Sequence, residues 1–188
     1  MAKLVYSAIA SLDGYVADER GEFGWSMPDE EVHAFVNDLE RPIGTYLYGR
    51  RMYEVMKVWE GDEVFADAVG AGAALLGDYA AIWREAEKIV YSRTLGEVST
   101  ARTRLKSSFD PAEVSALKEA EERDISIGGP ELATQALGAG LVDEIHLFLA
   151  PVGVGAGKPA FPIRKRLPLR LRDHRSFDNG TMYVHYRL

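Results

Sequence analysis

The stretch TYLYGRRMYEVM, residues 45–56, runs from an apolar segment through Gly49 into two arginines and then into an amphipathic segment. The apolar run predicts a buried strand, and the amphipathic run predicts a short helix from Arg50 to Val58. Arg50 and Arg51 therefore stand where a strand passes into a helix. Because two cations at such a place cost stability unless an anion lies against them, the stretch predicts a site for a local anion.

Strand and helix signals alternate on both sides of this stretch. Strand signals fall at residues 3–11, 44–49, 88–92, 125–129 and 144–151. Helix signals fall at residues 28–41, 50–58, 61–76, 110–123 and 130–137. Residues 177–188 close the chain as a hairpin around the turn Asn179-Gly180. This order predicts an α/β fold, with a mostly parallel central sheet flanked by helices and a C-terminal antiparallel hairpin at one edge. No linker or repeat interrupts it, so residues 1–188 form a single predicted domain.

The helix expected after residue 110 has the clearest start. Asp110 is the predicted N-cap, Pro111 takes the first helical position, and Glu113 completes a capping box.

The composition excludes several classes of function. The formal net charge is −7, whereas a protein that binds duplex nucleic acid is usually basic. There is no cysteine, which excludes disulfides and zinc–thiolate sites and fits a reducing cytoplasm. No apolar stretch approaches the ~18–20 residues of a membrane span, and the N-terminal run alternates like a strand rather than a signal peptide. We therefore expect a cytoplasmic protein with neither nucleic acid nor membrane as partner.

Unusual residues follow four of the predicted strands. These ends are Ser11-Leu12-Asp13-Gly14, Gly49-Arg50-Arg51, Ser92-Arg93-Thr94 and Gly128-Gly129-Pro130. Each alone has an ordinary explanation as a turn, a close packing contact or a solvated helix start. Ligands of open α/β sheets bind at the carboxyl ends of strands, where helix N-termini also favour anions. Together the four ends predict a site for a polyphosphate, and a dinucleotide has the right charge and length.

Other motifs fail. The run GVGAGKPA at 153–160 resembles a phosphate-binding loop, but Val152 and Pro159 occupy positions that need glycine and Ser or Thr. No G-x-G-x-x-G follows the first strand. The four histidines are scattered without metal-ligand spacing, so we expect no metal site, and His185 is interpreted as an ordinary strand residue.

The sequence resembles the dihydrofolate reductase superfamily, in particular bacterial members related to the reductase domain of riboflavin biosynthesis. The segments that carry the likeness, in chain order, are SLDGYVA at 11–17, YGRRMYE at 48–54, YSRTL at 91–95, and IGGPEL at 127–132 with LVDEIHLFLAP at 141–151. Each motif is modest, but all of them in the right order are specific, and the likeness spans nearly the whole chain.

The resemblance implies NADPH as hydride donor. It implies that the phosphates lie against Gly49, Arg50, Arg51 and Met52, with the 2′-phosphate against Ser92, Arg93 and Thr94. It also implies that Gly128, Gly129, Pro130, Glu131 and Leu132 wrap the pyrophosphate and nicotinamide ribose, and that Ala8, Ile9, Gly14, Tyr15 and Val16 border the nicotinamide. In the family the glycine pair is joined by a cis peptide, which is expected here too.

The implied substrate is a small planar heterocycle, such as a pterin or a flavin precursor, stacked over the nicotinamide. Its expected contacts are Asp13, Trp25, Phe35 and Leu149. Glu30 lies near the family's proton-relay carboxylate and is the candidate catalytic residue, or else only a first-turn acid favoured by the helix dipole. Met52 stands where the family often has Thr, which removes one hydroxyl contact to phosphate. Glu131 and Leu149 depart from the pattern of true folate reductases, which counts against folate itself.

The expected function is thus an NADPH-dependent reductase that transfers a hydride to a planar heterocycle. The alternative is a nucleotide-binding protein without turnover, since family likeness does not prove chemistry. Relatives of the riboflavin type pair through the antiparallel tail, so we also expect a homodimer. The sequence does not name the substrate.

Overall fold

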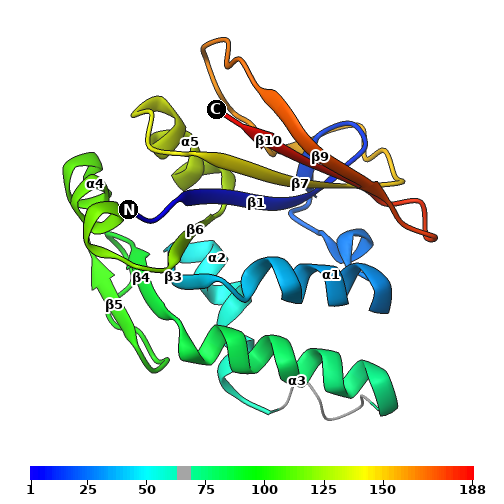
Figure 1. The fold of residues 1–188 in the computed structure, drawn as a ribbon, viewed down its shortest axis with the longest axis horizontal. Helices are drawn as coiled ribbons and strands as arrows, with labels where there is room; N and C mark the ends of the chain where they lie inside the picture. Colours follow the sequence, from blue (N-terminus) through cyan, green and yellow to red (C-terminus); the bar gives the residue numbers. More distant parts are fainter. Residues whose placement is uncertain (63–68) are drawn as a thin grey trace.

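The computed structural model describes residues 1–62 and 69–188, in which eight strands form one continuous sheet and two form a small second sheet (Figure 1). The strands of the large sheet are β1 (Leu4–Ser11), β3 (Ile43–Gly49), β4 (Glu87–Tyr91), β5 (Thr103–Lys106), β6 (Asp124–Gly128), β7 (Glu144–Ala150), β9 (Arg170–Ser176) and β10 (Met182–Arg187). The small sheet pairs β2 (Tyr15–Asp18) with β8 (Gly157–Pro159).

The strand order of the large sheet is β5-β4-β3-β6-β1-β7-β10-β9. The strands from β5 to β7 run parallel to their neighbours, and β10 runs antiparallel to both β7 and β9. Gly180 has φ +84° in the turn between β9 and β10, a conformation that glycine adopts at little cost. The predicted parallel sheet with a C-terminal antiparallel hairpin is therefore confirmed.

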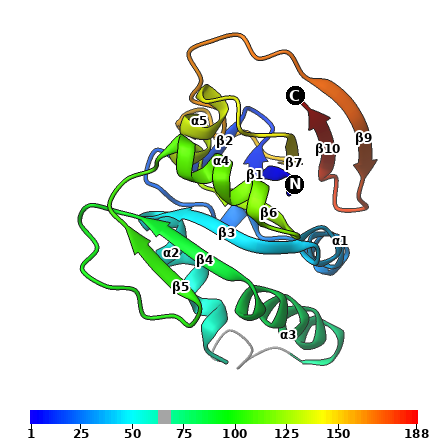
Figure 2. The same cartoon turned by 60° about the vertical axis from the view of Figure 1, so that its left-hand side comes forward.

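Helices cover both faces of the sheet (Figures 1 and 2). On one face lie α4 (Pro111–Ala120) and α5 (Pro130–Gly138), and on the other lie α1 (Glu30–Glu40), α2 (Arg50–Met56) and α3 (Gly70–Glu85). The described residues also form two 3-10 turns, η1 (Gly24–Ser26) and η2 (Lys57–Glu60). In the described parts of the chain, no helix combines the length and apolar character needed to cross a membrane.

The core has separate parts on the two faces of the sheet, because successive side chains of a strand point to opposite faces. Leu47 and Ile127 face α4 and α5, where they pack with Ala133. Tyr46 and Tyr48, the neighbours of Leu47 in β3, point the other way into a cluster with side chains of α2 and α3. A parallel strand that is buried on both faces has a continuous apolar sequence. The apolar run at residues 45–49 therefore predicted a buried strand.

Three details of the helices differ from the sequence prediction. The helix expected at 61–76 falls partly on residues 63–68, which lie outside the described residues, and the described helix runs from Gly70 to Glu85. Helix α4 ends at Ala120 rather than near residue 123. The capping box is absent, because the Asp110 carboxylate accepts from the backbone N–H of Ala112 while Glu113 pairs instead with Lys106.

Three strands were not predicted, namely β2, β5 and β8. Each has only three or four residues and no alternating apolar pattern, so its pairing depends on tertiary contacts.

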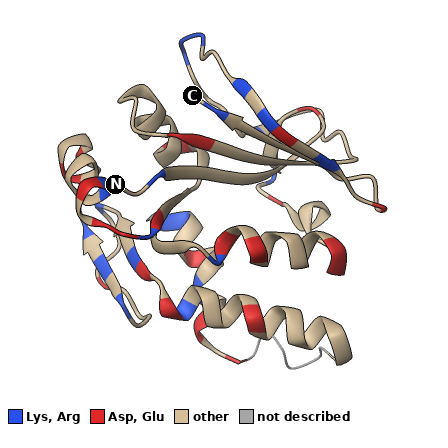
Figure 3. Ribbon diagram, viewed as in Figure 1, with Lys and Arg blue, Asp and Glu red and all other residues tan. Residues whose placement is uncertain are grey.

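Charges are distributed unevenly over the fold. Asp and Glu recur along α1, whereas Lys and Arg recur along β5 and β9, the two edge strands (Figure 3). Every residue of β9 is exposed in the single chain. Charged edge strands resist unwanted pairing. The expected homodimer stays a prediction.

Candidate active site

The carboxyl ends of the adjacent strands β4, β3, β6 and β1 open into a cleft made of two joined cavities. Their volumes are about 1010 Å³ and about 580 Å³. The wall common to both is formed by Arg51, Met52, Gly129, Glu131 and Lys158. This is the place where open α/β sheets bind their ligands, and the combined space suits a dinucleotide with a second small molecule beside it.

The smaller cavity collects the polar strand ends. The sequence-predicted residues that line it are Gly49, Arg50, Arg51, Met52, Ser92, Arg93, Thr94, Gly128, Gly129, Glu131 and Leu132. The loop after β4 is held by the Ser92 hydroxyl, which accepts from the backbone N–H groups of Thr94 and Leu95. An added Cβ at Gly49 would meet nothing within 4 Å, so the start of α2 stays open to the cavity.

The larger cavity is more apolar. The sequence-predicted residues that line it are Ala8, Ile9, Tyr15, Val16 and Pro130, together with members of the common wall. Tyr6 is a further wall residue, and its hydroxyl donates to the carbonyl of Ala160 at 2.7 Å. Burial raises the pKa of Tyr6, so this hydroxyl stays neutral. Gly14 lies in the turn before β2 with φ +90° and lines neither cavity.

The arginines of the cleft differ in their pairing. Arg50 forms an ion pair with Glu54 one helical turn away, at 3.1 Å. Arg51 and Arg93 are exposed and have no ion pair with any described residue. In a chain with net charge −7, two unpaired cations facing one cavity are poised for an anionic ligand.

The expected cis peptide between Gly128 and Gly129 is wrong, because the bond is trans. The chain turns into α5 through a φ of +92° at Gly129, which only glycine adopts without strain. A cis non-proline bond, which costs about 2.5–4 kcal/mol, is therefore not needed for the turn. Position 128 requires glycine for a different reason, because an added Cβ would lie 2.9 Å from the Tyr48 ring.

A family model described as the RibD C-terminal domain matches residues 2–183, nearly the whole chain. The chain belongs to the RibD C-terminal domain family. Its fold is the dihydrofolate reductase-like fold that the sequence predicted, which the solved structures support.

Relatives of this RibD C-terminal domain protein span the same length. The uncharacterized protein YyaP of Bacillus subtilis is 27% identical, and the alignment covers 98% of this chain and 94% of YyaP. A putative riboflavin biosynthesis protein from Shewanella sp. PV-4 superposes with a TM-score of 0.74 at 21% identity, over 100% of this chain and 98% of that one.

A third similar structure is a longer enzyme. It is the diaminohydroxyphosphoribosylaminopyrimidine deaminase/5-amino-6-(5-phosphoribosylamino)uracil reductase of Thermotoga maritima, with a TM-score of 0.68 at 15% identity. The match covers 99% of this chain but 56% of that enzyme. At such identity the likeness shows the fold of the RibD C-terminal domain and no more.

Asp13 does not belong to the cleft wall of this family member. Its carboxylate accepts from the Ser11 hydroxyl at 2.6 Å and from the backbone N–H groups of Val154 and Gly155. These hydrogen bonds, that of Ser11 above all, hold the pKa of Asp13 below its usual value. The residue therefore fastens the loop before β8 to the end of β1 and lines neither cavity, and its expected contact with substrate stays a prediction.

The other predicted substrate contacts also lie away from both cavities. Phe35 packs into an aromatic core cluster, with its ring centre 4.8 Å from that of Tyr183, because the apolar face of α1 lies on the sheet. Leu149 is half-buried in β7, and Trp25 sits in η1 with its indole N–H buried and unpaired. Neither residue lines a cavity, although Phe23 and Ser26, the neighbours of Trp25, line the larger one.

Glu30 is not brought to the cleft. It is exposed in the first turn of α1, and its Oε1 would lie 3.3 Å from a Cβ placed on Gly72 in α3. It lines neither cavity. Its position matches the second interpretation, a first-turn acid favoured by the helix dipole.

Sequence reasoning missed several cleft residues. Lys158 reaches the common wall because β8 pairs with β2, and it forms an ion pair with Glu131 at 3.1 Å. Its signal was the glycine-rich run at 153–160, which fails as a phosphate-binding loop yet delivers a lysine to the cleft. Ser107, Ser108 and Gln135 also line the smaller cavity. No motif marks them, since the two serines follow β5, a strand that was not predicted, and Gln135 is a mid-helix residue of α5.

Proposed function

We propose that this protein is an NADPH-dependent reductase that transfers a hydride to a small planar heterocycle of the pterin or flavin-precursor class. The observation that carries the proposal is the joined pair of cavities, of which one presents unpaired arginines and the other an apolar wall. A dinucleotide with phosphates at one end and a flat redox ring at the other needs this division of the cleft.

The residues present fit such a cofactor. Arg51 and Arg93 supply planar, bidentate donors for phosphate oxygens, and no described acid already occupies them. The Ser92 and Thr94 hydroxyls lie beside Arg93 and add neutral donors. The glycine at position 49 leaves the backbone accessible at the start of α2.

When bound, the reduced nicotinamide supplies the hydride. The chain's own contribution is position and the exclusion of water. Ile9 and Tyr15 offer apolar surface for a flat ring at the end of β1 and the start of β2. Pro130 takes the first position of α5, where its missing N–H costs no helical hydrogen bond, and the N–H groups of the next two residues have no acceptor within the helix.

The substrate class is supported by the size and lining of the larger cavity. Its apolar wall continues beyond the nicotinamide region to Phe23 and Val55, which suits a planar ring. Ser7, Ser26 and Arg20 supply polar groups around that wall for ring heteroatoms or a pendant anionic group. The Thermotoga maritima relative is named as a reductase of a substituted uracil, a ring of this class.

A binding and turnover experiment tests the proposal. NADPH is titrated into the full chain by fluorescence, and NADPH oxidation is then followed with pterins, aminopyrimidines, flavins and quinones. We expect saturable binding and oxidation with at least one heterocycle. Arg51→Ala should weaken NADPH binding by roughly ten- to a hundredfold, and Arg172→Ala, an exposed arginine on β9, should leave it unchanged. Absence of NADPH binding in the wild type would rule the proposal out.

The alternative, a nucleotide-binding protein without turnover, is favoured by one observation. Glu30, the acid expected to relay a proton, lies outside the cleft. Tight NADPH binding with no oxidation by any member of the substrate panel would support that alternative.

A further inference from the structure

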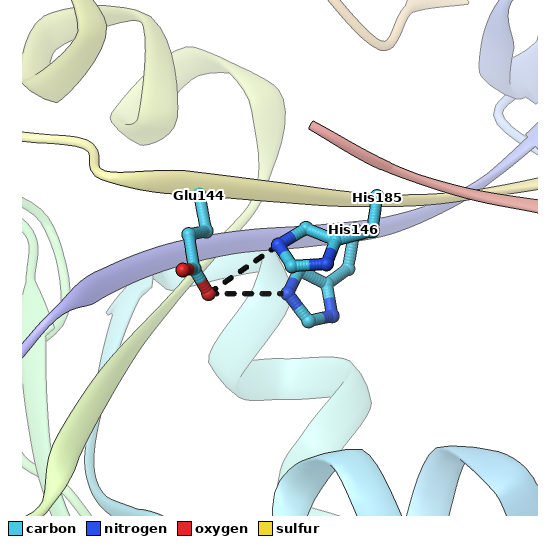
Figure 4. A group of neighbouring side chains, drawn as sticks. All are labelled: Glu144, His146 and His185. Carbon is cyan, nitrogen blue, oxygen red and sulfur yellow. Dashed lines mark ion pairs between the residues drawn. The ribbon is translucent and has the colours of Figure 1, made fainter. Parts of the chain in front are cut away.

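Two histidines and a glutamate that are distant in sequence meet on one face of the sheet. Glu144 and His146 are two residues apart in β7 and therefore share a face, and His185 is the antiparallel partner of His146 in β10. Figure 4 shows both imidazole rings beside the Glu144 carboxylate, with dashed lines joining each ring to the same oxygen. Within the described residues, this is the group whose donor atoms could together hold a metal ion.

The donor atoms are close and lack other partners. Oε2 of Glu144 lies 3.4 Å from Nε2 of His185 and 3.7 Å from Nε2 of His146. All three atoms lie within 4.8 Å of one another. Both Nε2 atoms are buried from solvent and have no hydrogen-bond partner among the described residues. Buried polar nitrogens without a partner are uncommon and need an explanation.

The surrounding groups orient these donors. Nδ1 of His146 shares a hydrogen bond of 3.1 Å with the hydroxyl of Tyr183, which turns Nε2 toward the carboxylate. A partner on the second ring nitrogen is the usual support of a metal-ligating histidine. Lys3 holds Oε1 of Glu144 at 3.0 Å and leaves Oε2 for the histidines, and its own side chain is half exposed.

The donor set suits a divalent cation. One carboxylate oxygen and two imidazole nitrogens form a common ligand set for a divalent metal.

We propose that Glu144, His146 and His185 form a site for a tetrahedral divalent metal ion of the zinc class. Two donors that each lie about 2.1 Å from a tetrahedral zinc ion stand roughly 3.4 Å apart, close to the two nitrogen-to-oxygen separations found here. An octahedral ion of the magnesium class prefers oxygen ligands instead. Three protein ligands leave a fourth position for water.

The three proposed ligands line neither cavity of the cleft. Glu144 begins β7 and pairs with Val5 near the start of β1, and His146 pairs with Ser7, which lines the larger cavity. The proposed site therefore lies beside the cleft but is formed by different residues. A metal here would join β10 to β7 and so fasten the C-terminal hairpin to the parallel sheet.

Metal titration of the untagged full chain tests the proposal. After chelator treatment, we expect one Zn²⁺ per chain and a rise in Tm of roughly 5–10 °C when the free ion exceeds its Kd about a hundredfold. Co²⁺ should give the intense visible absorption of tetrahedral coordination. His185→Gln should weaken binding at least about a hundredfold, and His174→Gln, an exposed histidine on β9, should not change it.

Two results would overturn the proposal: no stoichiometric binding by the wild type, or equal binding by His185→Gln. The Tm of each variant without metal checks folding. If His185→Gln does not fold, Tyr183→Phe replaces it, because this change keeps the ring and removes the partner of His146 Nδ1. It should weaken Zn²⁺ binding by about 10- to 100-fold, and unchanged affinity would count against the site.

Discussion

The ammonium group of Lys158 lies 3.1 Å from Oε1 of Glu131, and this ion pair joins β8 to the first turn of α5 at the wall common to both cavities. Glu131 thus neutralises the charge of Lys158, and an anionic ligand could replace Glu131 as the partner of this lysine. Glu131 is largely exposed, so water can replace its half of the pair at little cost.

The two members of this pair should affect NADPH binding in opposite directions. Lys158→Met removes a charged donor and should weaken binding by roughly ten- to a hundredfold. Glu131→Gln frees the lysine and should strengthen binding by up to about fivefold, the value of an exposed ion pair. Fluorescence titration measures both, with Lys165→Met as a control outside the cleft. Weaker binding in both variants would mean that the pair serves the fold rather than the ligand.

Arg93 should distinguish NADPH from NADH. The two cofactors differ by one 2′-phosphate, and Arg93 is an unpaired arginine on the wall of the smaller cavity. Arg93→Ala should weaken NADPH by roughly ten- to a hundredfold and leave NADH nearly unchanged. Arg104→Ala, on the neighbouring edge strand β5, is the matched control. Equal losses for both cofactors would show that Arg93 contacts a group common to them.

The smaller cavity was largely predictable from the sequence because it is built from strand ends. The residues after β3, β4 and β6 converge by topology alone, so Arg51, Arg93 and Gly129 could be grouped without coordinates. The alternation of strand and helix signals predicted the parallel order, and the turn Asn179-Gly180 predicted the terminal hairpin. These patterns could not give the peptide geometry at Gly128-Gly129, which depends on a single dihedral angle at the start of α5.

The residues expected to contact a substrate were not predictable in the same way. Phe35 and Leu149 were assigned by analogy, but helical spacing on α1 directs Phe35 into the core, and Leu149 lies within β7 away from the cleft. Lys158 reaches the cleft wall because two short strands pair, and neither strand has an alternating apolar pattern that would predict it. His146 and His185 are 39 positions apart and meet only through strand register, which spacing along the chain cannot reveal.

Asp13 should act on stability rather than on substrate affinity. Its carboxylate holds two backbone N–H groups of the loop before β8, so Asp13→Asn should lower Tm at pH 7. The folded pKa of Asp13 is depressed, so its contribution is present above the unfolded value of about 3.9 and fades as pH falls through the folded value. Thermal melts from pH 7 to pH 3 should therefore show the two curves converging in acid. Asp178→Asn is the control, and a difference that persists undiminished in acid would contradict this account.

Glu40 should make the protein less stable as pH rises. It is buried at the end of α1, where its Oε2 and the hydroxyl of Tyr46 have no hydrogen-bond partner among the described residues. Burial raises the pKa of Glu40 from 4.5 to about 7. Between these two values the folded chain binds more protons at this site than the unfolded chain does, so the free energy of unfolding falls with pH across that window and levels off above it.

Glu40→Gln removes this titration and keeps the shape of the side chain. The shift corresponds to roughly 3 kcal/mol, so the variant should gain up to that amount over the wild type at pH 8 and little at pH 4. Urea unfolding at both pH values measures the difference, with the exposed Glu119→Gln on α4 as the control. The sign decides the matter: a variant that loses stability at pH 8 would mean that the ionised carboxylate is paired in the fold and that burial does not govern its pKa.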